Sequence, residues 1–192
     1  SYAWNEINYD LPEDRNGFNR DSTGNGVAVG VKWDMTDLLV GDLALNYGEQ
    51  TYDDPRLADV DGWGLGAGLT WTPRRTSIVN VRLRASPQET TQPGTSGYWS
   101  QLWSARYQEE LRMNLLFNLR GSYTDNSYET PGLDPGTELS GTEVYRADIG
   151  LSYLFNRNVS LSGGYGYERQ DSNIGAFGYS ANRLFILLGL AL

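Results

Sequence analysis

Charged side chains recur at every second position in several segments of this 192-residue chain, and they are the residues best suited to act on a ligand. The set is Arg82, Arg84, Arg106, Arg120, Arg146, Asp42, Asp148 and Glu168. Guanidinium groups fixed along a path favour anions over cations. If the arginines instead meet the carboxylates, the same residues form a ladder of ion pairs that fills a narrow interior. The sequence leaves both interpretations open.

The residue types that most enzymes use are missing. The chain has no His and no Cys, which removes the commonest general base near neutral pH, the commonest metal ligand and the thiolate nucleophile. No Gly-x-Ser-x-Gly elbow and no Ser-x-x-Lys pair is present to activate a serine. We therefore expect no enzyme and no cofactor.

Further carboxylates gather in three polar segments. They are Asp10, Glu13, Asp14 and Asp21; Asp53, Asp54, Asp59 and Asp61; and Asp125, Glu129, Asp134 and Glu138. Calcium prefers several oxygen ligands, but none of the three groups has the spacing of a calcium-binding loop. We predict solvated acidic loops and no metal site.

The bulk composition excludes two further classes of protein. A net charge of -9 and a pI near 4.5 disfavour a nucleic-acid partner, because phosphate binding needs a basic surface. Mean hydropathy is -0.50, and no apolar run approaches the roughly 20 residues of a transmembrane helix. A transmembrane β-barrel remains compatible, since apolar and polar side chains alternate along its strands.

Apolar and polar residues alternate along most of the chain. From Val27 to Trp33 the odd positions are Val or Trp, and the even positions are Ala, Gly or Lys. The alternation recurs in segments 39–48, 63–71, 79–86, 113–123, 145–153 and 159–168. This period of two is typical of half-buried β-strands. Segments 1–9 and 99–107 fit less cleanly, and in 1–9 a bulge or a chain end breaks the parity; both are still predicted to be strands.

The connections alternate in length. Short turns are predicted near 34–38, 72–76, 108–112 and 155–158, and long polar segments near 10–23, 51–61, 87–96, 125–142 and 170–177. Outer-membrane barrels have tight periplasmic turns and longer extracellular loops. We predict one all-β domain, residues 1–192, that forms an antiparallel up-and-down transmembrane barrel of about ten strands or the C-terminal part of a wider barrel.

Alternation alone fits a soluble barrel or sandwich as well as a membrane barrel. The placement of the aromatic residues favours the membrane barrel. Trp63 and Trp71 lie on one face, about 26 Å apart along a strand. That spacing matches the roughly 25 Å apolar band between the aromatic girdles of outer-membrane barrels. The predicted girdle residues are Trp33, Tyr47, Trp63, Trp71, Tyr123, Tyr145 and Tyr153.

The segment from Asn182 to Leu192 is almost wholly apolar. It resembles the C-terminal strand by which the barrel-assembly machinery recognises its substrates, although that signal usually ends in an aromatic residue and this one ends in Leu192. The expected partners are this machinery, outer-membrane lipid and lipopolysaccharide, and an anionic polysaccharide or small solute.

Short motifs along most of the chain resemble a family of β-barrel porins that includes outer-membrane proteins of exopolysaccharide operons. The motifs are Arg20-Asp21-Ser22, Tyr52-Asp53-Asp54-Pro55, Leu69-Thr70-Trp71-Thr72-Pro73 and Gly164-Tyr165-Gly166-Tyr167-Glu168. The resemblance implies a passive outer-membrane channel, porin-like or associated with polysaccharide export, and no catalytic residues. The alternative is a non-conducting structural or adhesive barrel that acts through extracellular loops 10–23 and 125–142.

Overall fold

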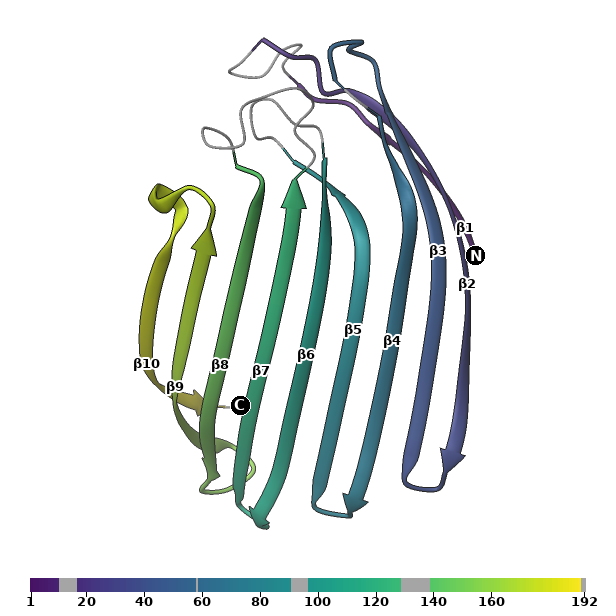
Figure 1. Cartoon of the computed structure of the whole chain (residues 1–192). Coiled ribbons are helices and arrows are strands. Elements are labelled where there is room, and N and C mark those ends of the chain that lie inside the picture. The colour runs from purple at the N-terminus through teal and green to yellow at the C-terminus, as the bar shows by residue number, and fades with distance from the viewer. Residues whose placement is uncertain (11–16, 58, 91–96, 129–138, 191–192) are drawn as a thin grey trace.

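The computed structural model describes residues 1–10, 17–57, 59–90, 97–128 and 139–190, which form one sheet. Ten strands follow one another in chain order, each antiparallel to the next (Figure 1). Their bounds are β1 Tyr2–Ile7, β2 Ser22–Thr36, β3 Leu39–Tyr52, β4 Val60–Arg74, β5 Ser77–Glu89, β6 Gly97–Arg112, β7 Leu115–Tyr128, β8 Gly141–Leu154, β9 Val159–Ser172 and β10 Tyr179–Leu190. The predicted all-β meander and its strand number are confirmed. Within the described residues no helix is long and apolar enough to cross a membrane.

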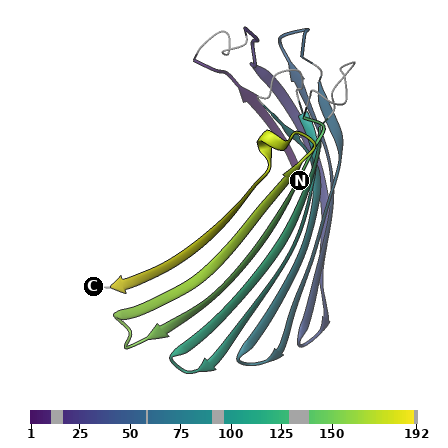
Figure 2. The same ribbon diagram turned by 60° about the vertical axis from the view of Figure 1, so that its left-hand side comes forward.

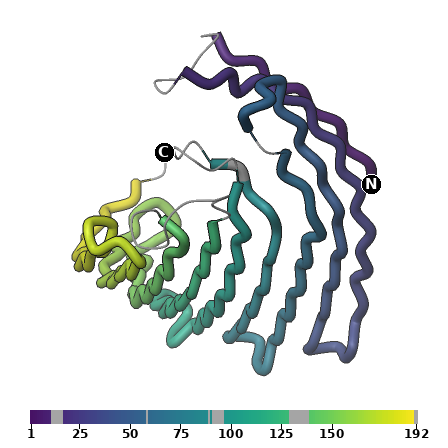
Figure 3. Tube along the Cα trace, turned by 45° about the horizontal axis from the view of Figure 1, so that its top comes forward, coloured from purple at the N-terminus to yellow at the C-terminus, as the bar shows by residue number. Residues whose placement is uncertain are grey.

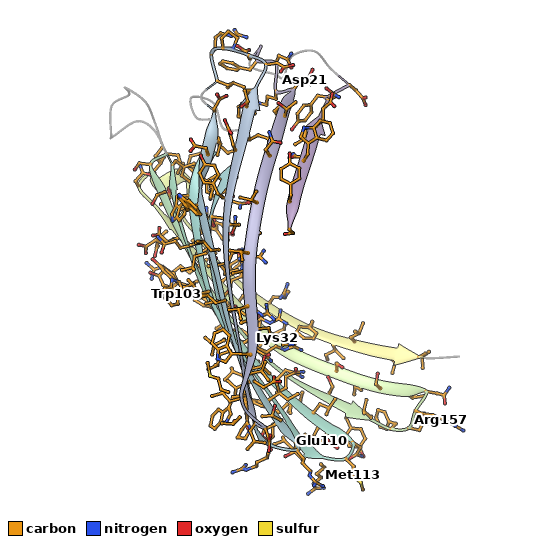
Figure 4. The ribbon with its side chains drawn as sticks, turned by 90° about the vertical axis from the view of Figure 1, so that its right-hand side faces the viewer. Asp21, Lys32, Trp103, Glu110, Met113 and Arg157 are labelled. Carbon is orange, nitrogen blue, oxygen red and sulfur yellow. The ribbon has the colours of Figure 1, made fainter. Side chains whose placement is uncertain are left out.

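Tight turns gather at one end of the sheet and long connections at the other. Two residues join β6 to β7, and Figure 4 shows Met113 of this turn and Arg157 of the β8–β9 turn far from Asp21. The turn predicted at 108–112 was wrong, because β6 continues to Arg112. The loop predicted at 125–142 was too long, since β7 runs to Tyr128. Both errors arise because strands end where backbone pairing ends, and this pairing continues beyond the apolar stripe.

Alternate side chains lie on opposite faces of the curved sheet. Directly opposed residues of antiparallel neighbours point to the same face, so one row joins Leu43, Ala67, Leu83 and Trp103. Figure 4 shows Trp103 on the convex side and Lys32 on the other side. The alternation in the sequence therefore places apolar residues on the convex face and the charged residues on the concave face. Strand β1 also pairs regularly with β2, without the suspected bulge.

Aromatic residues on the convex face form two levels. Near the long connections, ring centroids are 5.3 Å apart in the pair Tyr47–Trp63 and 4.9 Å apart in Tyr123–Tyr145. Near the tight turns, Tyr107 and Phe117 make an edge contact at 6.2 Å. The turn-side level also contains Trp33, Trp71, Tyr153 and Phe155. The seven residues predicted as girdle thus lie at two heights of one face, and their membrane role stays a prediction.

Each aromatic level descends by one residue per strand. The register joins Trp33 on β2 to Leu69 on β4, two strands away and two residues before Trp71. It joins Trp71 to Ile149 on β8, four strands further and four residues before Tyr153. A stagger of one residue per strand, about 3.3 Å against a strand spacing of about 4.8 Å, gives a tilt of about 35°. Strands of outer-membrane barrels have this tilt.

The sheet is curved but not closed among the described residues. Strand β1 pairs with β2 alone and β10 with β9 alone, and the ribbon curls so that the two edges stay apart (Figures 2 and 3). The described buried hydrophobic residues are Tyr52, Leu139 and Val144. No second layer of described residues covers the convex face, which distinguishes this sheet from the soluble sandwich considered above.

Replacing Leu43 by Arg is expected to destabilise the sheet in lipid by about 2 to 4 kcal/mol, the cost of arginine facing the bilayer midplane. Leu43 is 44% exposed on the convex face. The matched control is Ala44→Arg, because Ala44 lies on the concave face between Gly30 and Gly66. Urea titration of the chain refolded in vesicles measures the difference. Equal costs for the two variants would show that the lipid-facing side has been assigned wrongly.

Candidate functional site

All eight charged residues singled out from the sequence lie on the concave face. Arg82 and Arg84 come from β5, Arg106 from β6 and Arg120 from β7. Arg146 and Asp148 come from β8, Asp42 from β3 and Glu168 from β9. The strand register brings them into three neighbouring rows across the sheet. Their role in a pore stays a prediction.

Two arginines form ion pairs with the carboxylates of Asp148 on β8 and Glu168 on β9. Arg146 Nε lies 2.7 Å from Glu168 Oε2, and the Tyr179 hydroxyl donates to the same carboxylate. Arg183 Nη2 lies 3.3 Å from Asp148 Oδ1. Arg183 has an odd number, unlike the predicted set. It lies opposite Gly166 in the register and therefore belongs to the charged face. Its partner is two strands away, so its sequence position alone could not reveal the pair.

A glycine makes the Asp148–Arg183 contact possible. Gly166 of β9 lies between the two residues in the register. A Cβ at Gly166 would lie 2.6 Å from Asp148 Oδ1, closer than real Cβ atoms approach other atoms. Any larger residue would therefore push the Asp148 carboxylate away from Arg183. Gly166 therefore leaves open the space in which Asp148 meets Arg183.

The other four arginines of the predicted set have no ion-pair partner within 4.0 Å in the described part of the chain. They are Arg82, Arg84, Arg106 and Arg120. Arg106 and Arg120 are directly opposed on β6 and β7, an arrangement that is destabilising for like charges. The two interpretations left open by the sequence therefore stay predictions. Arg146 and Arg183 belong to ion pairs, and β5–β7 carry a patch of uncompensated positive charge.

Glycines flank this patch on β4. Gly62, Gly64, Gly66 and Gly68 alternate with Trp63, Leu65 and Ala67, so the concave face of β4 is bare backbone from residue 62 to residue 68. The Asp42 carboxylate occupies the space that a side chain at Gly68 would fill. Arg82 lies opposite Gly68 on the other side. The carboxylate therefore leans toward Arg82, although the two charges stay beyond ion-pair distance.

The connections beside β2 and β3 hold a second cluster of charged residues. Arg56 Nε and Nη2 donate to the Asp54 carboxylate at 2.9 and 2.6 Å, and the Asn19 amide donates to it at 3.1 Å. The Arg56 guanidinium lies 4.7 Å from the centroid of the Phe18 ring. Arg20 donates to the Thr90 carbonyl oxygen at 2.8 Å. These contacts tie three successive connections together at the end of the sheet opposite the tight turns.

This cluster also bears on the acidic residues of the connections. Hydrogen bonds from the Arg56 side chain and backbone amide hold the pKa of Asp54 well below its usual value. Asp54 is therefore ionised at neutral pH and paired with Arg56. Among the described residues no group of three or more acidic, His or Cys side chains could hold a metal ion. Of the acidic residues named from the sequence, Glu13, Asp14, Glu129, Asp134 and Glu138 lie outside the described residues.

Replacing Asp54 by Asn is expected to increase tryptic cleavage after Arg56 several-fold, because the guanidinium loses its charged partner. Asp53→Asn is the matched control, since Asp53 is exposed beside it. The lowered pKa means that the contact forms fully at neutral pH, survives as pH falls through about 4, and is lost only in stronger acid. Equal cleavage of the two variants would mean that the ion pair does not order this connection.

Comparison with known proteins identifies a family over almost the whole chain. A model of the family described as Putative beta-barrel porin 2 matches residues 1–191. No curated protein matches the chain. The match supports a barrel, an outer-membrane location and a non-enzymatic role, while its description names no solute and no link to polysaccharide. The chain belongs to the Putative beta-barrel porin 2 family.

Proposed function

We propose that the chain forms a passive outer-membrane pore that favours anions, with the concave face of the sheet lining the path. The observation that carries this proposal is the patch of four arginines on β5–β7 without carboxylate partners among the described residues. Fixed positive charge along a narrow path lowers the barrier for anions and raises it for cations. The solute class is a small anion or an anionic polysaccharide.

The height of the arginine patch supports this proposal. Followed with the stagger of one residue per strand, the two aromatic levels cross β7 at Leu116 and Thr124. Arg120 lies midway between them, and Arg82 lies midway on β5 by the same construction. If the levels are the membrane interfaces, the uncompensated charge lies at the middle of the span. Charge has its strongest effect on permeation there, far from the screening salt on either side.

The convex face supports contact with outer-membrane lipid and lipopolysaccharide. Its rings lie at the two ends of an apolar band, where amphipathic side chains settle at headgroup depth. Closure requires that the free edges of β1 and β10 are paired, because an unpaired backbone edge is not tolerated in hydrocarbon. The apolar β10 is the strand that we expect the barrel-assembly machinery to recognise.

Replacing Arg82 and Arg84 together by Gln is expected to shift the reversal potential in a salt gradient toward cation preference. Gln keeps hydrogen-bonding capacity and removes only the charge. The matched control is the Arg75→Gln, Arg157→Gln double variant, which removes the same charge from two turns at the end of the sheet. Single-channel recording in planar bilayers measures the reversal potential of both variants.

Two results would overturn the proposal. A pore with cation preference in the unchanged chain would show that the arginines do not set selectivity. A folded, lipid-inserted chain without any conductance would favour the non-conducting barrel that acts through its loops.

A further inference from the structure

We infer that the concave face holds a specific binding site for an oxyanion, a carboxylate or phosphate group of an anionic solute, between Arg106 and Arg120. The site deepens the proposed function, because it gives the solute a place to stop rather than only a favourable field. The two arginines are directly opposed on β6 and β7, so their Cβ atoms are about 5 Å apart.

Both arginines line one cavity. The cavity, a hollow of about 380 Å³, is lined by Arg106, Arg120, Arg183, Asp148, Asn118 and Phe185, among other residues. Sites for small ligands begin at about 300 Å³, so the hollow accommodates a small solute or one unit of a chain. The planar guanidinium forks match the two oxygens of a carboxylate or phosphate.

The carboxylate opposite the pair, that of Asp148, is already paired with a third arginine. Asp148 lies directly opposite Arg120 in the register. Its carboxylate instead reaches across Gly166 to Arg183, with Oδ1 3.3 Å from Nη2. The Asp148 carboxylate also lines the hollow, but it is paired with Arg183, and neither Arg106 nor Arg120 has an ion-pair partner within 4.0 Å among the described residues. A bound oxyanion would supply the opposite charge and relieve the repulsion between them.

One wall of the hollow is apolar. Phe185 points to the concave face, because it is opposed to Gly164, which shares its row with Gly150. A Cβ at Gly164 would lie 2.7 Å from the Phe185 ring, so the ring occupies the space over this glycine. The hollow thus offers two cationic forks beside an aromatic ring. This combination fits an oxyanion carried on a ring-shaped or apolar body, such as an acidic sugar.

Calorimetric titration of the refolded chain in detergent with inorganic phosphate, and separately with glucuronate, tests the site. We expect saturable binding that Arg106→Gln and Arg120→Gln each weaken about tenfold or more, the usual loss for one hydrogen bond to a charged group. Lys32→Gln is the control, because it removes one positive charge from the concave face of β2, away from the hollow. Tighter binding of glucuronate identifies a sugar carboxylate, and tighter binding of phosphate identifies a phosphoryl group.

The glycine provides a second test that keeps every arginine. Gly166→Ala is expected to push Asp148 toward Arg120 and to weaken binding by a similar factor. Adding Asp148→Asn to the Gly166→Ala chain is expected to restore binding, because the competing charge is then gone. If Gly166→Ala does not refold, Asp148→Asn alone is expected to bind phosphate at least as tightly as the unchanged chain.

Absence of saturable binding to both probes would overturn the site, as would equal losses in Lys32→Gln and Arg120→Gln. These outcomes are separate from those for the pore, because the titration needs no current. A chain that binds the probes but does not conduct refutes the pore alone. A chain that conducts anions but does not saturate refutes the site alone.

Discussion

The backbone hydrogen bonds between neighbouring strands are the interaction on which everything else in this structure depends. The described part of the chain is a single layer with three buried hydrophobic residues, so no packed core holds the strands together. Every strand from β2 to β9 pairs on both sides. This ladder leaves both faces of the sheet free, one apolar and one charged. It also leaves two edges that a bilayer tolerates only when they are paired.

Small residues then determine how charges meet on the concave face. Opposed positions on two adjacent strands are close enough to touch, and positions two strands apart normally are not. Gly166 removes the intervening side chain, so Asp148 pairs with Arg183 rather than with Arg120. Gly68 similarly admits the Asp42 carboxylate without bringing it within ion-pair distance of Arg82. The distribution of positive charge thus depends on glycines as much as on arginines.

The period of two and the alternating connections were enough to predict the strands, their order and the two faces of most of them, while the facing of segment 1–9 was left unassigned. Strand ends were harder to predict, as at Tyr128 and Met113, because the backbone ladder continues where the apolar stripe has stopped. The charge pairs were not predictable. Whether Asp148 meets Arg120 or Arg183 depends on the register of four strands and on the space over Gly166. The alternation gives no information on either.

The arginines without carboxylate partners among the described residues indicate whether the concave face is hydrated. An interior packed with side chains, as in a narrow barrel, has to pair its charges, because an isolated buried ion costs several kcal/mol. Arg146 and Arg183 meet that condition, whereas Arg106 and Arg120 are opposed to each other about midway between the two aromatic levels. In a membrane-spanning sheet, two opposed guanidinium groups at this depth need water or an anion beside them. A hydrated concave face is therefore the arrangement in which this set of charges is stable.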